Sequence, residues 1–193
     1  MTYYVGKWQD HKILVENSDS EKLTLDGEVV MQTKPGLRFA SVLTAEIPGT
    51  NGLSIYVMLN GTHSCYCVVG KPLKVEYDKS AKKFAAEYNG HTIEAMNKLK
   101  ARMYIDGEEI DKEGEGLRDF VILGSPADEN GKHFMAIVDG ATVGLSLHPK
   151  CDIYAEAENV RMVRCEKVGG ELVPVQGSDA DAAFIAGFCI GNM

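Results

Sequence analysis

Short apolar runs alternate with polar turn residues along most of the chain. Within Leu23–Leu25 and again within Met103–Ile105, apolar and more polar positions alternate with period two, as they do in half-buried strands. Asp-Gly and Asn-Gly pairs separate several runs, and such pairs readily adopt the positive φ angles of two-residue hairpin turns. The pattern therefore predicts antiparallel strands joined by hairpins. The pairs stand at residues 26–27, 60–61, 89–90, 106–107 and 139–140.

The hydrophobic pattern also repeats. When the chain is shifted by 80 residues, ten of the 33 positions from 11 to 43 are identical to their counterparts, whereas average residue usage gives about two by chance. A match of this length indicates an internal repeat, in which two segments of about 80 residues adopt the same fold. The matching pairs include His11 with His91, Asp26 with Asp106, Gly36 with Gly116, Arg38 with Arg118 and Leu43 with Leu123.

The predicted architecture is all-β, with two tandem antiparallel β-sandwich or barrel-like units of about 80 residues. Residues 1–80 form the first unit and residues 81–163 the second, with a polar seam near Asp78–Lys83. Seven or eight strands are expected in each unit, because the turn signals recur at short intervals. In the first unit the expected strands cover residues 3–8, 11–17, 22–26, 28–33, 38–47, 53–59, 62–69 and 72–77.

Residues 164–193 do not complete a third unit. Val163–Val168 and Glu171–Val175 predict a lone C-terminal hairpin that covers the open edge of the second unit. A pattern at Ser178–Asp181 that resembles a capping box predicts a short helix after it. Residues 182–193 carry no charge, so their apolar side chains are expected to be buried, either within the chain or against a second copy in a homodimer. The large apolar residues of this tail are Phe184, Ile185, Phe188 and Ile190.

Composition narrows the classes of partner and compartment. The 193 residues include 28 Asp or Glu and 20 Lys or Arg, so the formal net charge is -8. This balance argues against a nucleic-acid partner, because a protein that neutralises phosphates needs a surplus of cations. The uncharged stretch Ile47–Gly70 is interrupted by Pro48 and several Gly and Asn residues, so no membrane-spanning helix is expected. No signal peptide is recognisable, and five cysteines are an odd number for a disulfide framework, so we expect a cytoplasmic protein with reduced thiols.

The chain offers little familiar chemistry. It contains no Gly-x-Ser-x-Gly, His-Glu-x-x-His or Walker A motif, so the sequence predicts no catalytic residue and no cofactor. His63, Cys65 and Cys67 share one face of an expected strand and offer three soft ligands. A structural zinc site usually has a fourth ligand, and free cysteine is commonly buried. Core packing without a metal is therefore the preferred interpretation, and a metal- or thiol-dependent enzyme that uses these three residues is an alternative.

Six residues that match between the two units are the candidate ligand-binding residues. The paired histidines can serve as ligand contacts or acid–base groups, or each can begin a strand and bond its own hairpin. The paired arginines can bind a carboxylate or order their own loops. The paired aromatic residues can form a carbohydrate platform or pack in the core. In each pair the structural role is the preferred interpretation; the six residues are Trp8, His11, Arg38, Tyr88, His91 and Arg118.

A series of motifs in the first unit has a counterpart in a known family. Trp8, His11–Ile13 (His-Lys-Ile) and Leu25–Glu28 (Leu-Asp-Gly-Glu) are followed by Cys67–Leu73, which reads Cys-Val-Val-Gly-Lys-Pro-Leu. In this order they resemble the Fas apoptotic inhibitory molecule family, in which a Trp, a His-Lys-Ile, an apolar-Asp-Gly turn and a late Gly-Lys-x-Leu occur in tandem β-rich units. The second unit lacks the late motif. The resemblance implies paired antiparallel β-sandwich units that act by protein contact without catalysis, and it supplies no catalytic residues.

The leading functional hypothesis is a non-enzymatic binding or protein-interaction module, whose partner is another protein or a small ligand. It depends on the lack of catalytic motifs and on the repetition of a small scaffold. The first alternative is a carbohydrate- or small-ligand-binding protein, which predicts an exposed aromatic cluster that includes Tyr3, Tyr4 and Tyr56. The second alternative is the metal- or thiol-dependent enzyme described above.

Overall fold

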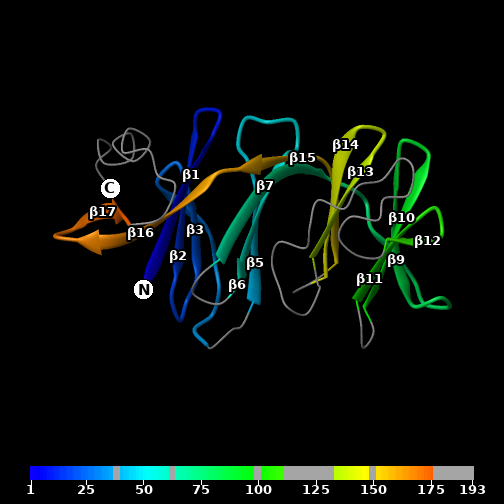
Figure 1. The fold of residues 1–193 in the computed structure, drawn as a ribbon, viewed down its shortest axis with the longest axis horizontal. Coiled ribbons are helices and arrows are strands. Elements are labelled where there is room, and N and C mark those ends of the chain that lie inside the picture. The colour runs from blue at the N-terminus through cyan, green and yellow to red at the C-terminus, as the bar shows by residue number, and fades with distance from the viewer. Residues whose placement is uncertain (37–39, 61–63, 98–100, 111–132, 148–150, 176–193) are drawn as a thin grey trace.

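The computed structural model describes residues 1–36, 40–60, 64–97, 101–110, 133–147 and 151–175. Over these residues the fold is all-β, as the sequence predicts: the strands form three antiparallel sheets, none of them is closed into a barrel, and no helix is present. The sheets lie side by side along the long axis of the molecule (Figure 1). No described segment forms a helix that is long and apolar enough to cross a membrane.

Sheet A forms one end of the molecule. Its strand order is β17-β16-β1-β2-β3-β4. The chain begins in this sheet and returns to it near the C-terminus, so that Tyr3 and Cys165 are cross-strand partners. The strands are β1 (Thr2–Trp8), β2 (His11–Asn17), β3 (Lys22–Leu25), β4 (Glu28–Gln32), β16 (Met162–Val168) and β17 (Glu171–Pro174).

Sheet C forms the opposite end, with the strand order β12-β11-β10-β9-β8. Sheet B lies between the two ends, with the order β13-β14-β15-β7-β6-β5. The strands of sheet C are β8 (Glu76–Asp78), β9 (Lys83–Tyr88), β10 (His91–Asn97), β11 (Ala101–Ile105) and β12 (Glu108–Ile110). Those of sheet B are β5 (Ala40–Glu46), β6 (Ser54–Asn60), β7 (Ser64–Pro72), β13 (His133–Val138), β14 (Ala141–Ser146) and β15 (Asp152–Val160).

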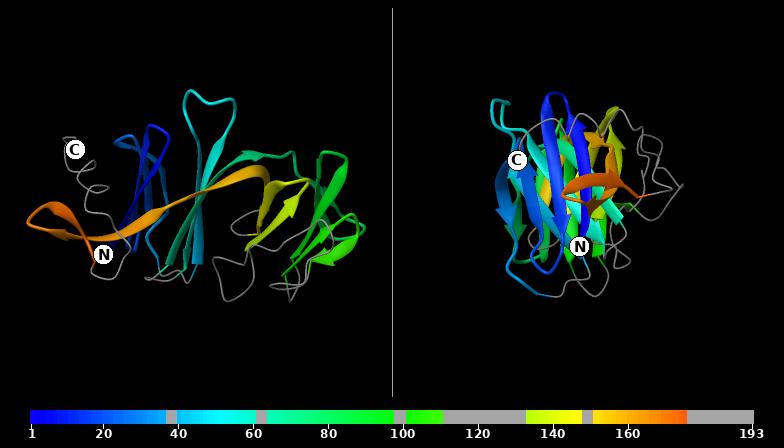
Figure 2. Two further views of the ribbon diagram at one scale, coloured as in Figure 1. Left: turned by 45° about the horizontal axis from the view of Figure 1, so that its top comes forward. Right: turned by 90° about the vertical axis from the view of Figure 1, so that its left-hand side faces the viewer.

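Sheet B is hydrogen-bonded throughout but forms two layers. The strands β7 and β15 pair with each other across the middle, and β5–β6 and β13–β14 extend from them as separate layers (Figures 1 and 2). The rings of Tyr56 on β6 and Tyr154 on β15 stack with their centroids 4.2 Å apart. A Cβ atom at Gly144 on β14 would collide with the ring of Tyr154, so this close packing requires glycine.

Three hydrophobic clusters hold the layers together. One lies between sheet A and β5–β7 and includes Ile13 and Leu43. A second lies between sheet C and β13–β15 and includes Ile93 and Leu145. The third joins the two layers of sheet B around Tyr154. Ile13 and Ile93 are both fully buried on the inner faces of their sheets, so sheet B supplies apolar surface to all three clusters and organises the fold.

The expected hairpin turns are confirmed where the structure describes both residues. At Asp26–Gly27, φ is 53° and 89°, the left-handed values that a tight hairpin requires. Asn89–Gly90, Asp106–Gly107 and Asp139–Gly140 have positive φ at both residues too. The expected turn at Asn60–Gly61 includes a residue outside the described ranges.

The strand expectations for the first unit are largely confirmed, and one expectation at the C-terminus is wrong. The eighth expected strand, 72–77, is instead divided between β7 and β8. The C-terminal hairpin β16–β17 pairs with β1 at the edge of sheet A, not with the second unit. The reason is that β15 pairs with β7 in the centre and only Arg161 separates its end from β16, so the chain continues to the sheet A side. The expected helix after Ser178 lies outside the described residues.

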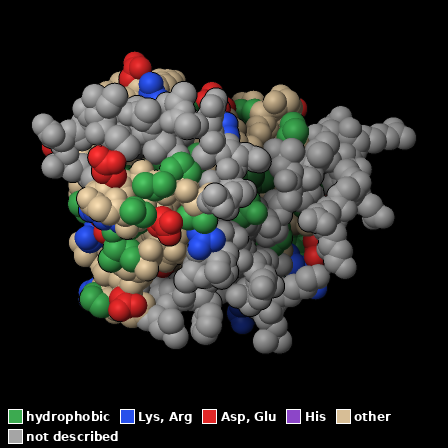
Figure 3. Space-filling model, turned by 60° about the vertical axis from the view of Figure 1, so that its left-hand side comes forward, with side chains coloured by type: hydrophobic (Ala, Val, Ile, Leu, Met, Phe, Trp, Pro, Cys, Tyr) green, Lys and Arg blue, Asp and Glu red, His purple; other side chains and the backbone are tan. Residues whose placement is uncertain are grey.

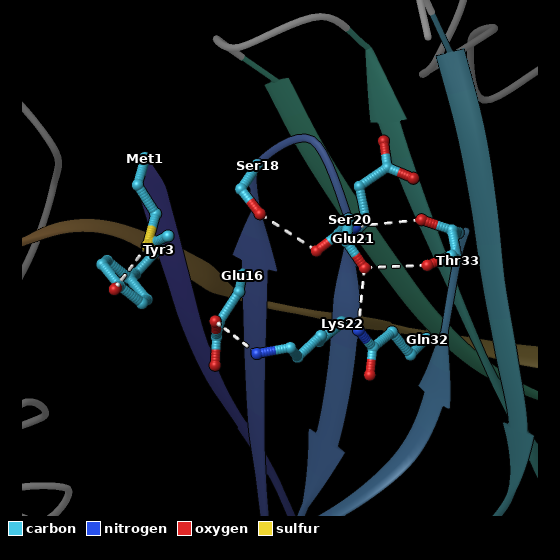
Figure 4. Close-up of polar contacts among 9 residues, drawn as sticks. All are labelled: Met1, Tyr3, Glu16, Ser18, Ser20, Glu21, Lys22, Gln32 and Thr33. Atoms are coloured by element: carbon cyan, nitrogen blue, oxygen red, sulfur yellow. Dashed lines mark hydrogen bonds and ion pairs between the residues drawn. The ribbon is translucent and has the colours of Figure 1, made fainter. Parts of the chain in front are cut away.

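Side-chain hydrogen bonds close the end of sheet A where β2 turns into β3 (Figure 4). Thr33 Oγ1 accepts a hydrogen bond from the Glu21 backbone N–H at 2.9 Å, and the Ser20 hydroxyl donates to the Thr33 carbonyl at 2.8 Å. The Glu21 carboxylate points away from these contacts, is buried, and has no hydrogen-bond partner for Oε2 among the described residues. The hydroxyl groups of Ser20 and Thr33, each bonded to the backbone of the other segment, therefore hold the loop.

Candidate functional site: two histidine corners and a groove

The first histidine corner joins the start of β2 to the turn between β3 and β4. His11 Nδ1 lies 2.6 Å from Asp26 Oδ2, and the Lys12 backbone N–H donates to Asp26 Oδ1 at 2.7 Å. The Asp26 N–H in turn donates to the Lys12 carbonyl at 2.9 Å. One carboxylate thus bonds both a ring nitrogen and the backbone, and this fixes the turn against the neighbouring strand.

The second corner repeats this arrangement at the start of β10. His91 Nδ1 lies 2.6 Å from Asp106 Oδ2, and the Thr92 N–H donates to Asp106 Oδ1 at 2.9 Å. This corner makes a further contact: His91 Nε2 lies 3.3 Å from Asp139 Oδ2. Because Asp139 is in the turn between β13 and β14, this contact links sheet C to sheet B.

An aromatic residue on the preceding strand is the cross-strand partner of each histidine. Trp8 is buried, with 7% of its surface exposed, and its ring stacks on the His11 ring at a centroid distance of 6.1 Å. Its indole N–H donates to Glu158 Oε2 on β15 at 2.8 Å. Tyr88, the cross-strand partner of His91, is half-buried. Trp8 therefore packs in the core and ties sheet A to β15, and it does not form an exposed platform.

The hydrogen bonds and charges at the two corners shift the pKa values of several of the residues that form them. Although burial opposes the effect, hydrogen bonds from His11 and the Lys12 N–H hold the pKa of Asp26 below its ordinary value. Hydrogen bonds from His91 and the Thr92 N–H lower the pKa of Asp106. The hydrogen bond to Asp106 and the nearby charges of Asp106 and Asp139 raise the pKa of His91. Burial and repulsion from Glu156 raise the pKa of Tyr88.

The structure brings the candidate residues together in two groups, one at each corner. Trp8 and His11 share the corner of sheet A, and Tyr88 and His91 share the corner of sheet C; the two sheets form opposite ends of the molecule (Figure 1). Arg38 and Arg118 lie outside the described residues.

Each histidine begins a strand, as the structural interpretation expected, and is the cross-strand partner of the aromatic residue in its own hairpin. Each binds the aspartate of the following hairpin, and those aspartates were expected only to form turns. The signal in the sequence was the spacing, because His and Asp are 15 residues apart in both copies. The third aspartate, Asp139, gave no such signal, because its contact with His91 is made between two sheets.

The thiols of Cys65 and Cys67 lie in an apolar environment on β7. Cys67 belongs to the cluster beneath sheet A, and Cys65 packs against it. Burial raises the pKa of both thiols, and the neighbouring Cys67 adds to the rise at Cys65. A raised pKa disfavours the thiolate that metal binding or nucleophilic attack needs. His63 lies outside the described residues.

The aromatic residues expected to bind carbohydrate do not form an exposed cluster. Tyr4 and Tyr56 are buried, with 3% and 2% of their surfaces exposed. The exposed tyrosines are instead Tyr66 on β7 and Tyr77 on β8, which are 45% and 50% exposed. They lie on different sheets, so they do not pair with each other in one platform.

A groove of about 330 Å³ lies where β15 leaves sheet B and continues as β16. β15 pairs with β7 as far as Val160 and Cys67. Beyond Cys67, no described strand pairs with this edge of β7, which includes Cys65 and Tyr66. We call this the crossover groove; its lining residues are Cys65, Tyr66, Cys67, Val68, Met135, Asn159, Val160 and Met162.

The surface at the sheet A end is mixed in character. On the face shown in Figure 3, hydrophobic side chains form small groups between acidic and basic ones. Val29, Val30, Val168 and Val173 are exposed hydrophobic residues of this sheet. Isolated exposed residues of this kind are normal for a protein surface. The crossover groove is therefore the more specific candidate for binding.

The described residues contain no group of three or more His, Cys, Asp or Glu side chains that could hold a metal ion. Comparison of the chain with protein-family models, curated proteins and solved structures finds no match. The resemblance to the Fas apoptotic inhibitory molecule family stays a prediction.

Proposed function

We propose that this chain is a non-enzymatic binding protein that holds an extended, apolar segment of another protein in the crossover groove. Two related β-sandwich units, residues 1–80 and 81–163, form its framework. The repeat at an offset of 80 residues supports this description. The matching bonds of His11 and His91 to their aspartates, both 2.6 Å long, support it too.

The observation that carries the proposal is the edge of β7 beyond Cys67, with which no strand in the described part of the chain pairs. β15 leaves this edge after Val160, and β6 occupies the other edge of β7. An unpaired edge presents backbone donors and acceptors to which an extended peptide can add as a further strand. This chemistry selects a peptide backbone and does not select a sugar or a metal ion.

The lining of the groove favours apolar side chains in that peptide. None of its residues is charged. Met135 and Met162 contribute flexible thioether side chains, which adapt to differently shaped partners. Tyr66 is 45% exposed at the groove, and tyrosine is enriched in protein interfaces. A short segment with an apolar residue at every second position would place those residues on the groove side.

A random decapeptide library displayed on phage tests the proposal directly. We expect selection on the folded protein to enrich apolar, alternating sequences. Tyr66→Ala should weaken the binding of those peptides by roughly tenfold, because an exposed interfacial tyrosine is a common source of binding energy. Tyr77→Ala is the matched control, because Tyr77 is similarly exposed on another sheet.

Two outcomes would contradict the proposed binding site. One is that no peptide is enriched on the folded protein. The other is that the enriched peptides bind Tyr66→Ala and Tyr77→Ala equally well, which would place their site elsewhere.

The uncharged tail supports a further partner, a second copy of this chain. Residues 182–193 lie outside the described residues, and their sequence carries no charge. We expect sedimentation to show a dimer for the full chain and a monomer for a chain truncated after Gln176. Four cysteines are free among the described residues, which is compatible with our proposal of a cytoplasmic, reducing compartment.

A further inference from the structure

His91 is placed between two carboxylates from two different sheets. Its Nδ1 lies 2.6 Å from Asp106 Oδ2, in the turn between β11 and β12 of sheet C. Its Nε2 lies 3.3 Å from Asp139 Oδ2, in the turn between β13 and β14 of sheet B. The imidazole is therefore a bridge between the two sheets.

The protonation state of His91 follows from counting donors. A neutral imidazole has one N–H, and its other nitrogen is an acceptor. An ionised carboxylate is also only an acceptor. Two ring nitrogens that both face carboxylates are satisfied together only when both carry protons, so this geometry fits the imidazolium ion.

Two further titratable groups, Tyr88 and Glu156, lie near this bridge. Tyr88 is the cross-strand partner of His91 on β9. Glu156, on β15, and Asp139 both raise the pKa of the Tyr88 phenol. The carboxylates of Asp106 and Asp139 favour a positive charge on the imidazole between them, whereas the Tyr88 phenol stays neutral while His91 titrates.

We propose that His91 is a proton-operated clasp, which ties sheet C to the β13–β14 turn while it is charged and releases that turn when it loses a proton. The neutral ring keeps the shorter bond to Asp106 and presents a lone pair to Asp139, so the longer contact is the one that is lost. The hydrogen bond between His91 and Asp106 raises the pKa of His91 and lowers the pKa of Asp106, which agrees with Asp106 being the partner that the ring keeps.

The variant Asp139→Asn separates the clasp from simple structural packing. Asn adopts positive φ readily, and residue 139 has a φ of 50°, so the turn is retained. The amide of the new side chain can donate to a neutral Nε2 while Nδ1–H still binds Asp106. The contact in this variant therefore no longer needs a second proton on the ring.

NMR measurements on the full chain test this expectation. The pKa of His91 is followed by its ring resonances, and the opening of the turn by amide protection factors of the terminal β13–β14 pair, Val138 and Ala141. In the wild type, protection should fall by roughly threefold or more as pH rises through the pKa of His91. In Asp139→Asn, the pKa of His91 should fall and the protection should be independent of pH.

The His11 resonances are the internal control and should be unchanged by Asp139→Asn. The clasp is refuted if wild-type protection stays constant while His91 titrates, or if it falls equally in Asp139→Asn. Were this variant to unfold, the wild-type titration alone would decide, because the clasp requires the two midpoints to coincide.

Discussion

The corner at His11 and the corner at His91 share their local bonds but connect to the central sheet in different ways. In each, an aspartate 15 residues after the histidine binds the ring and a backbone N–H. The first corner reaches sheet B through the indole N–H of Trp8, which binds Glu158. The second reaches it through the histidine itself, which contacts Asp139.

The strand β15 presents a carboxylate to each corner. Its pairing with β7 is irregular between Ala155 and Glu158, and Glu156 there has a φ of 54°. Such a bulge changes the direction in which successive side chains point. Glu158 consequently meets Trp8, and Glu156 acts on Tyr88. The comparison shows that the same His–Asp corner can be connected to sheet B in two ways. At the first corner the donor is the neutral indole of Trp8, and at the second it is the imidazole of His91, which titrates.

The largest effect is expected from the aromatic residues. Trp8→Ala removes a buried ring and should lower the free energy of unfolding by about 3–5 kcal/mol. Tyr88→Ala should cost clearly less, because Tyr88 is only half-buried. Chemical denaturation measures both values. Equal losses of unfolding free energy in the two variants would show that the two aromatic residues stabilise their corners to the same extent.

The aspartates come next. Ala at position 26 or 106 loses the bonds to the ring and the backbone and is strained at φ values of 53° and 52°. We expect each Asp→Ala variant to lower the melting temperature by roughly 4–8 °C. Asn is the matched control, because it tolerates this φ and still accepts a hydrogen bond. If Asn is as damaging as Ala, the carboxylate charge matters more than the turn geometry.

A smaller effect is expected at the bond between the first corner and β15. Glu158→Ala leaves the indole N–H of Trp8 without its acceptor and should cost about 1 kcal/mol. Glu158→Gln retains an acceptor oxygen, so its unfolding free energy should remain near that of the wild type. A loss of equal size in both variants would assign the role to the charge of Glu158.

The smallest effect is the pH dependence of the second corner. The pKa of His91 is raised above its ordinary 6.5, so its stabilisation is complete below that value and is lost as pH rises through the folded pKa. The pKa of Asp106 is lowered from 3.8, so its stabilisation is present above that value and is lost as pH falls through the folded pKa. The melting temperature of the wild type relative to His91→Asn should therefore be greatest between these two ordinary values. A difference that grows above neutral pH would reverse this assignment.

Much of the local structure follows from the order of residues. The Asp-Gly and Asn-Gly pairs predicted hairpin turns, and the described ones have the expected positive φ. The alternation at Leu23–Leu25 predicted a strand, which is found as β3. These features depend on neighbours in the chain, whose geometry the backbone determines directly.

Predictions that required distant contacts were less successful. The C-terminal hairpin was expected at the second unit, and this expectation was wrong because the hairpin pairs with β1. The bonds of the two histidines to Asp26 and Asp106 were not predicted. The crossover groove was not predicted, because it exists only where β15 separates from β7. No periodicity within either strand records that separation.

The amino-acid sequence alone therefore determined the strands, the tight turns and the equal spacing of His and Asp in the two corners. The tertiary structure decided that β15 pairs with β7, that β16 joins β1, and that Asp139 faces His91. The physical reason is the separation along the chain of the residues that determine each feature. Turn angles and side-chain alternation are set by residues a few positions apart, whereas strand pairing is chosen by burying apolar faces contributed from the whole chain.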